Sequence, residues 1–87
     1  MNPLPRVTAV EVLDGYVVRL TFKDGTVGSV DLADIVGKGP VFERLRDHSY
    51  FRRARVSRTL GTIVWPNGAD VAPETLYAQV IATSTAA

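Results

Sequence analysis

Six arginines lie within one short stretch of the chain, and they are the residues whose type and spacing are best suited to chemistry. Residues 44–58, called the arginine segment below, carry a charge of +5, six arginines against Asp47 alone, and the remaining four basic and eight acidic residues sum to −4. These arginines are Arg44, Arg46, Arg52, Arg53, Arg55 and Arg58. Tyr50 and Phe51 lie among them, a mixture suited to phosphates and bases. Three interpretations stay open: a solvated face, a surface for an acidic protein and a nucleic-acid-binding surface.

A second candidate site is the segment from Trp65 to Asp70, which places a large aromatic ring, a turn and a carboxylate within six residues. Small binding surfaces are often built this way, so Trp65, Asn67 and Asp70 are candidate partner-binding residues. A structural interpretation is also open. Trp65 can close the core, Asn67 can form a turn with Gly68, and Asp70 can hold backbone amides before the last helix.

Catalytic and metal chemistry have little support in this sequence. The chain has one histidine, His48, and no cysteine, so neither a zinc ligand set nor a histidine-based triad is evident. The glycine-rich residues 37–40 match neither the dinucleotide-binding nor the P-loop pattern. We therefore expect a non-enzymatic protein with no catalytic residue, no metal and no cofactor. The alternative is a small-molecule sensor or an enzyme with a pocket near Trp65.

Length and composition indicate one folded domain. The chain has 87 residues, of which 46% are apolar and 22% are charged, as in folded globular proteins. We expect a single domain over residues 1–87, with a core of about 6–81 and a frayed tail over 82–87. The absence of cysteine, of a signal-like N-terminus and of a long apolar run favours a cytoplasmic protein and no membrane association.

The first thirty residues predict a three-stranded antiparallel meander, because β-branched residues alternate with polar ones around two Asp-Gly turns. In the second hairpin, a three-residue loop of residues 23–25 with Gly25 left-handed places Val18 opposite Val30. In the first hairpin, a loop of residues 13–15 places Val10 opposite Val18 and leaves Glu11 and Arg19 on the other face. Both hairpins give one apolar face: Val10, Val12, Tyr16, Val18, Leu20, Phe22, Val30 and Leu32.

The remainder of the chain predicts short helices and strands that complete an α+β fold. We expect a helical turn over residues 31–36 capped by Asp31, a helix over 40–47 that covers part of the sheet, and a further turn capped by Ser49. Short strands are expected over 54–57, 62–65 and 69–71. Pro73 begins a last helix. The fold class is therefore an antiparallel β-meander with short additional strands, packed against two or three short helices.

With these residues in view, the chain resembles a prokaryotic family, domain of unknown function twenty-four forty-two, from about Arg6 to Tyr77. The residues that carry the resemblance are Phe22-x-Asp24-Gly25, Val30-Asp31-Leu32, Gly39-Pro40-x-Phe42-x-x-Leu45, Tyr50-Phe51, the run from Gly61 to Asp70, and Pro73. The run contains a Trp-Pro-Asn-Gly-Ala-Asp signature. This resemblance implies a small α+β fold like the N-terminal domain of longer members that also carry a helix-turn-helix.

The same resemblance implies a partner. Members are often encoded beside another small protein in an arrangement like that of toxins and antitoxins, so the leading hypothesis is a protein-binding, antitoxin-like module. Nucleic-acid binding through the arginine segment is the alternative. A homodimer is also open, since Val7, Ala9, Val17 and Val27 are expected on the outer face of the meander and short sheets leave open edges.

Overall fold

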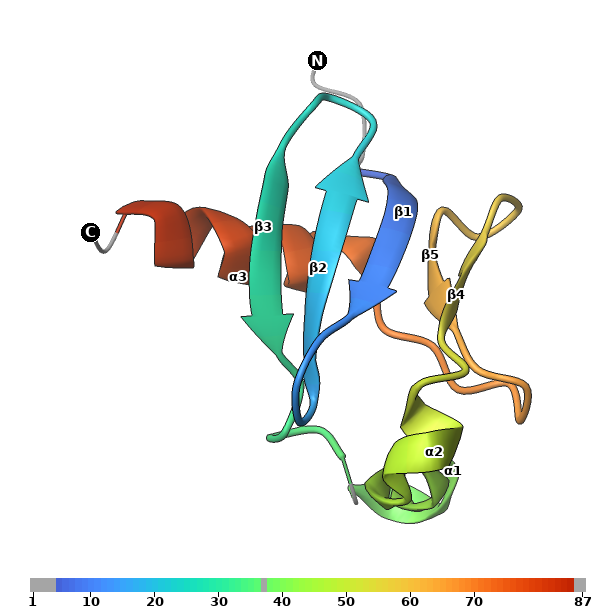
Figure 1. The fold of residues 1–87 in the computed structure, drawn as a ribbon. Coiled ribbons are helices and arrows are strands. Elements are labelled where there is room, and N and C mark those ends of the chain that lie inside the picture. Colours follow the sequence, from blue (N-terminus) through green and yellow to red (C-terminus); the bar gives the residue numbers. More distant parts are fainter. Residues whose placement is uncertain (1–4, 37, 86–87) are drawn as a thin grey trace.

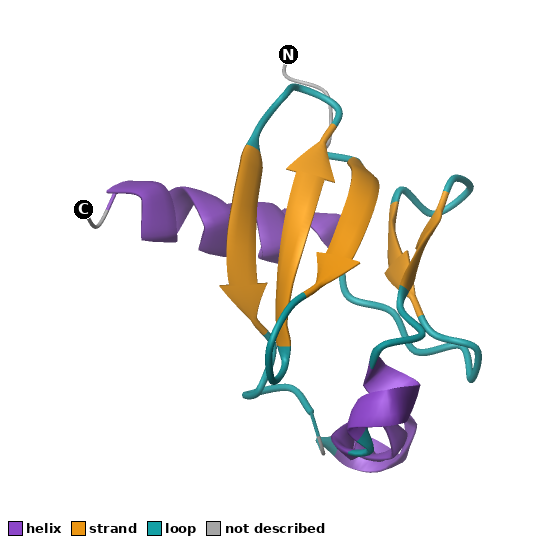
Figure 2. Ribbon diagram, viewed as in Figure 1, coloured by secondary structure: helices purple, strands orange, loops and turns teal. Residues whose placement is uncertain are grey.

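The computed structural model describes residues 5–36 and 38–85, with the side chains of 5–36 and 38–82. Its elements form a three-stranded sheet, a separate two-stranded sheet and short helices, as Figures 1 and 2 show. The strands are β1 (Val7–Val12), β2 (Val17–Phe22), β3 (Val27–Asp31), β4 (Arg55–Ser57) and β5 (Thr62–Val64). The helices are α1 (Gly39–Glu43), the 3-10 turn η1 (Arg44–Arg46), α2 (His48–Phe51) and α3 (Pro73–Thr85). The predicted α+β class is confirmed.

The hairpin of β2 and β3 forms in the predicted register. Val18 pairs with Val30, and the amide of Phe22 donates to the carbonyl oxygen of Thr26 at 2.8 Å. Gly25 has a φ of 92°, a left-handed conformation that a residue without Cβ adopts at little cost. The alternation of apolar residues therefore predicted the pairing of this hairpin correctly.

The predicted register of the first hairpin is wrong by two residues. β1 and β2 pair Val12 with Val18 and Val10 with Leu20, and the amide of Leu13 donates to the carbonyl oxygen of Val17 at 2.8 Å. The hydroxyl of Tyr16, which lies between these strands, donates to the carbonyl oxygen of Arg46. Because the shift is even, the same side chains still face the core.

Val7 lies in the core, and its predicted place on the outer face is wrong. The pairing of β1 shifts between Val7 and Ala9, so one extra residue of β1 turns Val7 to the other side. Val7 is 3% exposed, and its amide donates to the carbonyl oxygen of Gly61 at 2.9 Å. This bond links the three-stranded sheet to the turn between β4 and β5.

The predicted core face is confirmed, but the helix that covers it is α3. In Figure 1, α3 crosses one face of the three-stranded sheet, while α1 and α2 lie beyond one end of it. Leu76 and Val80 of α3 are buried, and a Cβ added to Gly28 of β3 would lie 2.6 Å from Cγ1 of Val80. The expectation that the helix beginning near Pro40 covers the sheet is therefore wrong, because Gly28 admits α3 instead.

The predicted helix over 40–47 is divided into a short α-helix and a tighter 3-10 turn. α1 ends at Glu43, η1 follows, and the next cap is Asp47 instead of the predicted Ser49. Asp47 Oδ1 accepts from the backbone amide of Ser49 at 3.1 Å and from its hydroxyl at 2.8 Å. Asp31 caps its turn as predicted, accepting from the amide of Ala33 at 2.9 Å. Gly37, part of the predicted stop of that turn, lies outside the described residues.

The last part of the chain follows the prediction closely. β4 and β5 pair antiparallel, and Val64 makes an isolated bridge to Asp70. α3 extends to Thr85, beyond the predicted end of the core at residue 81. Within the described ranges, none of the helices has the length and apolar character to cross a bilayer.

Candidate functional site

All six arginines of the arginine segment have exposed side chains. Arg44 and Arg46 lie on η1, Arg52 and Arg53 follow α2, Arg55 lies on β4, and Arg58 lies in the turn after β4. In Figure 1, these elements run from the helices at the end of the sheet up into the β4–β5 hairpin. The backbone of the arginine segment therefore runs along one side of the molecule.

None of these arginines forms an ion pair with another described residue. The ion pair in the described part of the chain joins Arg19 Nη1 and Glu11 Oε1 at 2.9 Å on the outer face of the sheet. Asp47, the single acid of the segment, is occupied by Ser49, whose hydroxyl and then whose amide hold the pKa of Asp47 below its ordinary value. The positive charge of the segment is thus left without an ion-pair partner in the described structure.

Tyr50 orders two of the arginines. The Cζ atoms of Arg44 and Arg53 lie 4.6 and 5.6 Å from the centroid of the Tyr50 ring, distances at which a cation is attracted to an aromatic face. Tyr50 is 9% exposed and Phe51 is fully buried. The Tyr50 ring therefore positions two guanidinium groups, and neither Tyr50 nor Phe51 presents an open face on which a base could stack.

Trp65 lies in the core. It is 2% exposed, its Nε1 donates to the carbonyl oxygen of Phe51 at 2.9 Å, and its ring centroid lies 5.7 Å from that of Phe51. This geometry is the structural interpretation of Trp65, in which the indole closes the core and its polar atom is satisfied. Its contribution is to hold α2, and with it the arginine segment, against the β5 end.

Asn67 ties the same turn to α1. Its Nδ2 donates to the carbonyl oxygen of Val41 at 2.9 Å, and its Oδ1 accepts from the amide of Ala69 at 3.0 Å. Gly68 takes the left-handed conformation of the turn, with a φ of 90°. Asp70 is exposed. The structure thus brings the Trp65–Asp70 turn and the arginine segment together, with Asp70 as the acidic side chain of the turn.

His48 has a structural environment of its own. Its Nε2 lies 2.6 Å from the carbonyl oxygen of Gly15, and its ring stacks on Phe51 with a centroid distance of 6.2 Å. Over residues 5–36 and 38–85, no three His, Asp or Glu side chains come together in a group that could hold a metal ion. Sequence reasoning placed His48 at a helix end but missed its contact with the first hairpin, 33 residues away.

A cavity of about 290 Å³ opens between β1 and β4, and Trp65 is not among its lining residues. It is lined by Arg6, Val7, Thr8, Val56 and Arg58. Sequence reasoning did not single out Arg6. No local signal could have done so, because Arg6 meets Arg58 across 52 residues of chain.

The fold and this surface define a small α+β domain with a basic, exposed segment. The model of the family described as "Protein of unknown function (DUF2442)" matches residues 7–82, and the chain belongs to this family. The resemblance inferred from the sequence is confirmed.

A solved structure of related fold gives a second comparison. The crystal structure of "Putative DNA Binding Protein NE0471" from Nitrosomonas europaea ATCC 19718 is similar to this chain with a TM-score of 0.80 and 30% sequence identity. The similarity covers 98% of this chain and 56% of that chain, so the present chain spans just over half of its relative. No curated protein matches this chain.

Proposed function

We propose that this chain is a cytoplasmic, non-enzymatic protein-binding module whose arginine segment binds an acidic surface of another protein. The observation that carries this proposal is the set of six exposed arginines, none of which is ion-paired within the described structure. Arginine is enriched at protein interfaces, where its planar fork binds carboxylates through two parallel hydrogen bonds. Complementary charge also speeds the encounter with an acidic partner.

The local structure favours a protein partner over nucleic acid. α1 and α2 have five and four residues, too short to be read as groove-binding helices, and α3 carries Glu74 and no basic residue among its described side chains. The rings of Tyr50 and Phe51 are buried and do not stack on bases. The arginine segment presents guanidinium groups on short helices and a short strand. Guanidinium groups arranged in this way suit the carboxylates of a folded partner.

The product of the adjacent gene is the partner to test first, because family members are often encoded beside another small protein. An antitoxin-like role would follow if that product is toxic alone and is neutralised by this chain. The proposal rests on charge complementarity, so a partner with an acidic surface is required.

Co-expression of the two proteins, followed by calorimetric titration of the purified pair, tests the proposal. We expect a stable complex that the double variant Arg52→Gln/Arg55→Gln weakens by about tenfold or more, because each charge-assisted hydrogen bond contributes roughly 1.5–3 kcal/mol. Arg19→Gln is the matched control, since Arg19 lies on the outer sheet face and pairs with Glu11. Absence of any complex, or equal affinity of the double variant, would overturn the proposal.

A second candidate function is DNA binding, and the observation that favours it is the similarity to the "Putative DNA Binding Protein" of Nitrosomonas europaea. In this case the arginine segment would neutralise backbone phosphates, and affinity would fall steeply with salt because counterions are released. Titration of a fluorescein-labelled duplex at low and high salt distinguishes the two candidates. Tight binding at low salt that is lost in Arg52→Gln/Arg55→Gln would support DNA binding; no binding at low salt would end it.

A further inference from the structure

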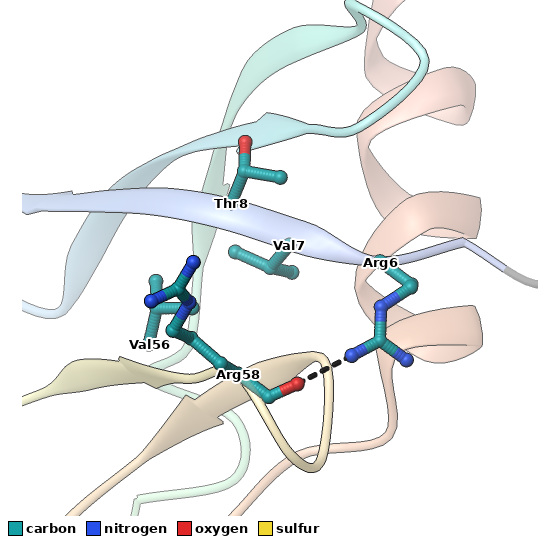
Figure 3. A pocket seen from close by; sticks show the side chains of 5 residues that line it. All are labelled: Arg6, Val7, Thr8, Val56 and Arg58. Carbon is teal, nitrogen blue, oxygen red and sulfur yellow. Dashed lines mark hydrogen bonds between the residues drawn. The ribbon is translucent and has the colours of Figure 1, made fainter.

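The cavity between β1 and β4 is lined by two valines and Thr8, and two arginines complete the lining. Figure 3 shows Val7 between the guanidinium groups of Arg6 and Arg58, with Val56 beside Arg58. The volume of about 290 Å³ lies just below the range of ligand pockets, which begins near 300 Å³. A cavity of this size fits a single side chain or a small anion better than a nucleotide or a cofactor.

Arg6 is held in place before any ligand arrives. Its Nη2 donates to the carbonyl oxygen of Arg58, and its own carbonyl oxygen accepts from the amide of Lys23 at 2.9 Å. The guanidinium lies over Gly61, where an added Cβ would come within 2.9 Å of Cζ of Arg6. Because the guanidinium is already oriented, less conformational entropy is lost when it binds an anion.

The charges around the cavity are of one sign. Arg6 and Arg58 come from segments 52 residues apart, yet both line the same cavity, and none of the five described lining residues carries a carboxylate. Two guanidinium groups that line one cavity, with no acid among its described lining residues, make the cavity positive and attract an anion. Among the described residues, the guanidinium of Arg6 donates to the Arg58 carbonyl alone, so other N–H groups of its planar fork can bind an oxyanion.

We propose that this cavity binds the carboxylate of a Glu or Asp side chain that the partner protein inserts between Arg6 and Arg58. This inference rests on the proposed function and adds to it a specific anchor that joins Arg58, the last residue of the arginine segment, to Arg6, which lies outside the segment. A carboxylate is favoured over a phosphate because the methylene groups of an acidic side chain can pack against Val56, the more exposed of the two valines, whereas a phosphate would place charge against its methyl groups. Such a buried charged anchor is typical of the few residues that dominate an interface.

The ligand chemistry is tested without the partner by two-dimensional NMR titration of the full chain with glutarate and, separately, with inorganic phosphate. Glutarate is expected to shift the amides of Val7, Thr8, Val56 and Arg58 in a saturable way. Arg58→Gln should weaken this binding about tenfold or more while keeping the carbonyl that Arg6 contacts, and Arg19→Gln should leave it unchanged. Phosphate binding as strong as glutarate, or no saturable shift, would overturn the carboxylate assignment.

The role of the cavity in partner binding is tested with Arg6→Gln in the purified complex. We expect at least about tenfold weaker binding of the partner, with an unchanged denaturation midpoint as the check on folding. If Arg6→Gln proves unstable, Arg58→Gln serves in its place. A partner that binds wild-type protein and Arg6→Gln equally would overturn the anchor and leave the proposed function standing. A partner that never binds would overturn both, even if glutarate occupies the cavity.

Discussion

The hydroxyl of Tyr77 donates a hydrogen bond to Oδ2 of Asp24 at 2.7 Å, joining the last helix to the turn between β2 and β3 across 53 residues of chain. The Tyr77 ring also meets Phe22 edge-to-face, with centroids 5.0 Å apart. Asp24 Oδ1 accepts from the amide of Thr26 at 2.9 Å. One carboxylate therefore fixes both its own turn and the helix that covers the sheet.

This pair predicts a pH dependence of stability. The Tyr77 hydroxyl first, and then the Thr26 amide, hold the pKa of Asp24 below its ordinary value of 3.8. Because the folded state releases this proton more readily than the unfolded chain, the stabilisation is present above the unfolded pKa and is lost as the pH falls through the folded pKa. Tyr77→Phe should raise the pKa of Asp24 toward its ordinary value, as measured by NMR titration of the carboxyl carbon.

Asp47 provides the internal control for that titration. Its lowered pKa comes from Ser49 and not from α3, so Tyr77→Phe should leave it in place. Urea denaturation at a series of pH values below 5 should show a smaller acid-dependent loss of stability in the variant than in the wild type. An unchanged Asp24 pKa in Tyr77→Phe would mean that the hydrogen bond does not persist in solution.

The contact between Gly28 and Val80 predicts strong coupling between β3 and α3. Gly28→Ala should destabilise the fold by about 1–3 kcal/mol, because its Cβ would lie within van der Waals overlap of a stiff, buried valine. Val80→Ala, costly by itself, should remove that overlap, so the double variant should be more stable than the sum of the two single effects by about 1 kcal/mol. Urea denaturation of the four proteins measures this, and additive effects would contradict the close packing.

The indole of Trp65 should be a large contributor to stability. Trp65→Phe removes the donor to the Phe51 carbonyl and leaves a void in the core, for an expected loss of about 2–4 kcal/mol. Leu60→Ala is the control, because Leu60 is 52% exposed and its truncation should change stability by less than about 0.5 kcal/mol. A small loss of stability in Trp65→Phe together with weaker partner binding would indicate that Trp65 contacts the partner.

The arginines of the proposed interface should be dispensable for folding. Arg52 and Arg55 are exposed and belong to no described ion pair, so Arg52→Gln/Arg55→Gln should alter the free energy of unfolding by less than about 0.5 kcal/mol. The measurement is urea denaturation of the variant beside the wild type. A loss above about 1.5 kcal/mol would show that these side chains stabilise the fold and would weaken their assignment to binding.

Local sequence signals were sufficient to predict much of this fold. Gly25, the pairing of Val18 with Val30 and the turn at Asn67 and Gly68 follow from alternation and turn chemistry, which act within a few residues. The register of the first hairpin was predicted wrongly because a two-residue shift keeps the same side chains on the core face. The apolar pattern therefore cannot distinguish the two registers. The Tyr16 hydroxyl contact with Arg46 belongs to the observed register, and it depends on a residue 30 positions away.

The site was only partly predictable for the same reason. Charge density marked the arginine segment, since composition alone reveals it, and the structure leaves its side chains exposed. Arg6 and the cavity depend on the meeting of distant segments. In the fold, Gly28 is a local signal that the sequence prediction did not use. An isolated glycine within a strand is typical of a close approach by another element, here α3.

The chain contains a single tryptophan, and that indole lies against Phe51 with its nitrogen bonded to the Phe51 carbonyl. Its emission wavelength and lifetime therefore report on the surroundings of Phe51 in α2, the helix that precedes Arg52 and Arg53. A ligand that reshapes the arginine segment should alter the indole's spectrum with no attached dye. A ligand that docks on the outer face of the sheet should leave the emission spectrum of the indole unchanged.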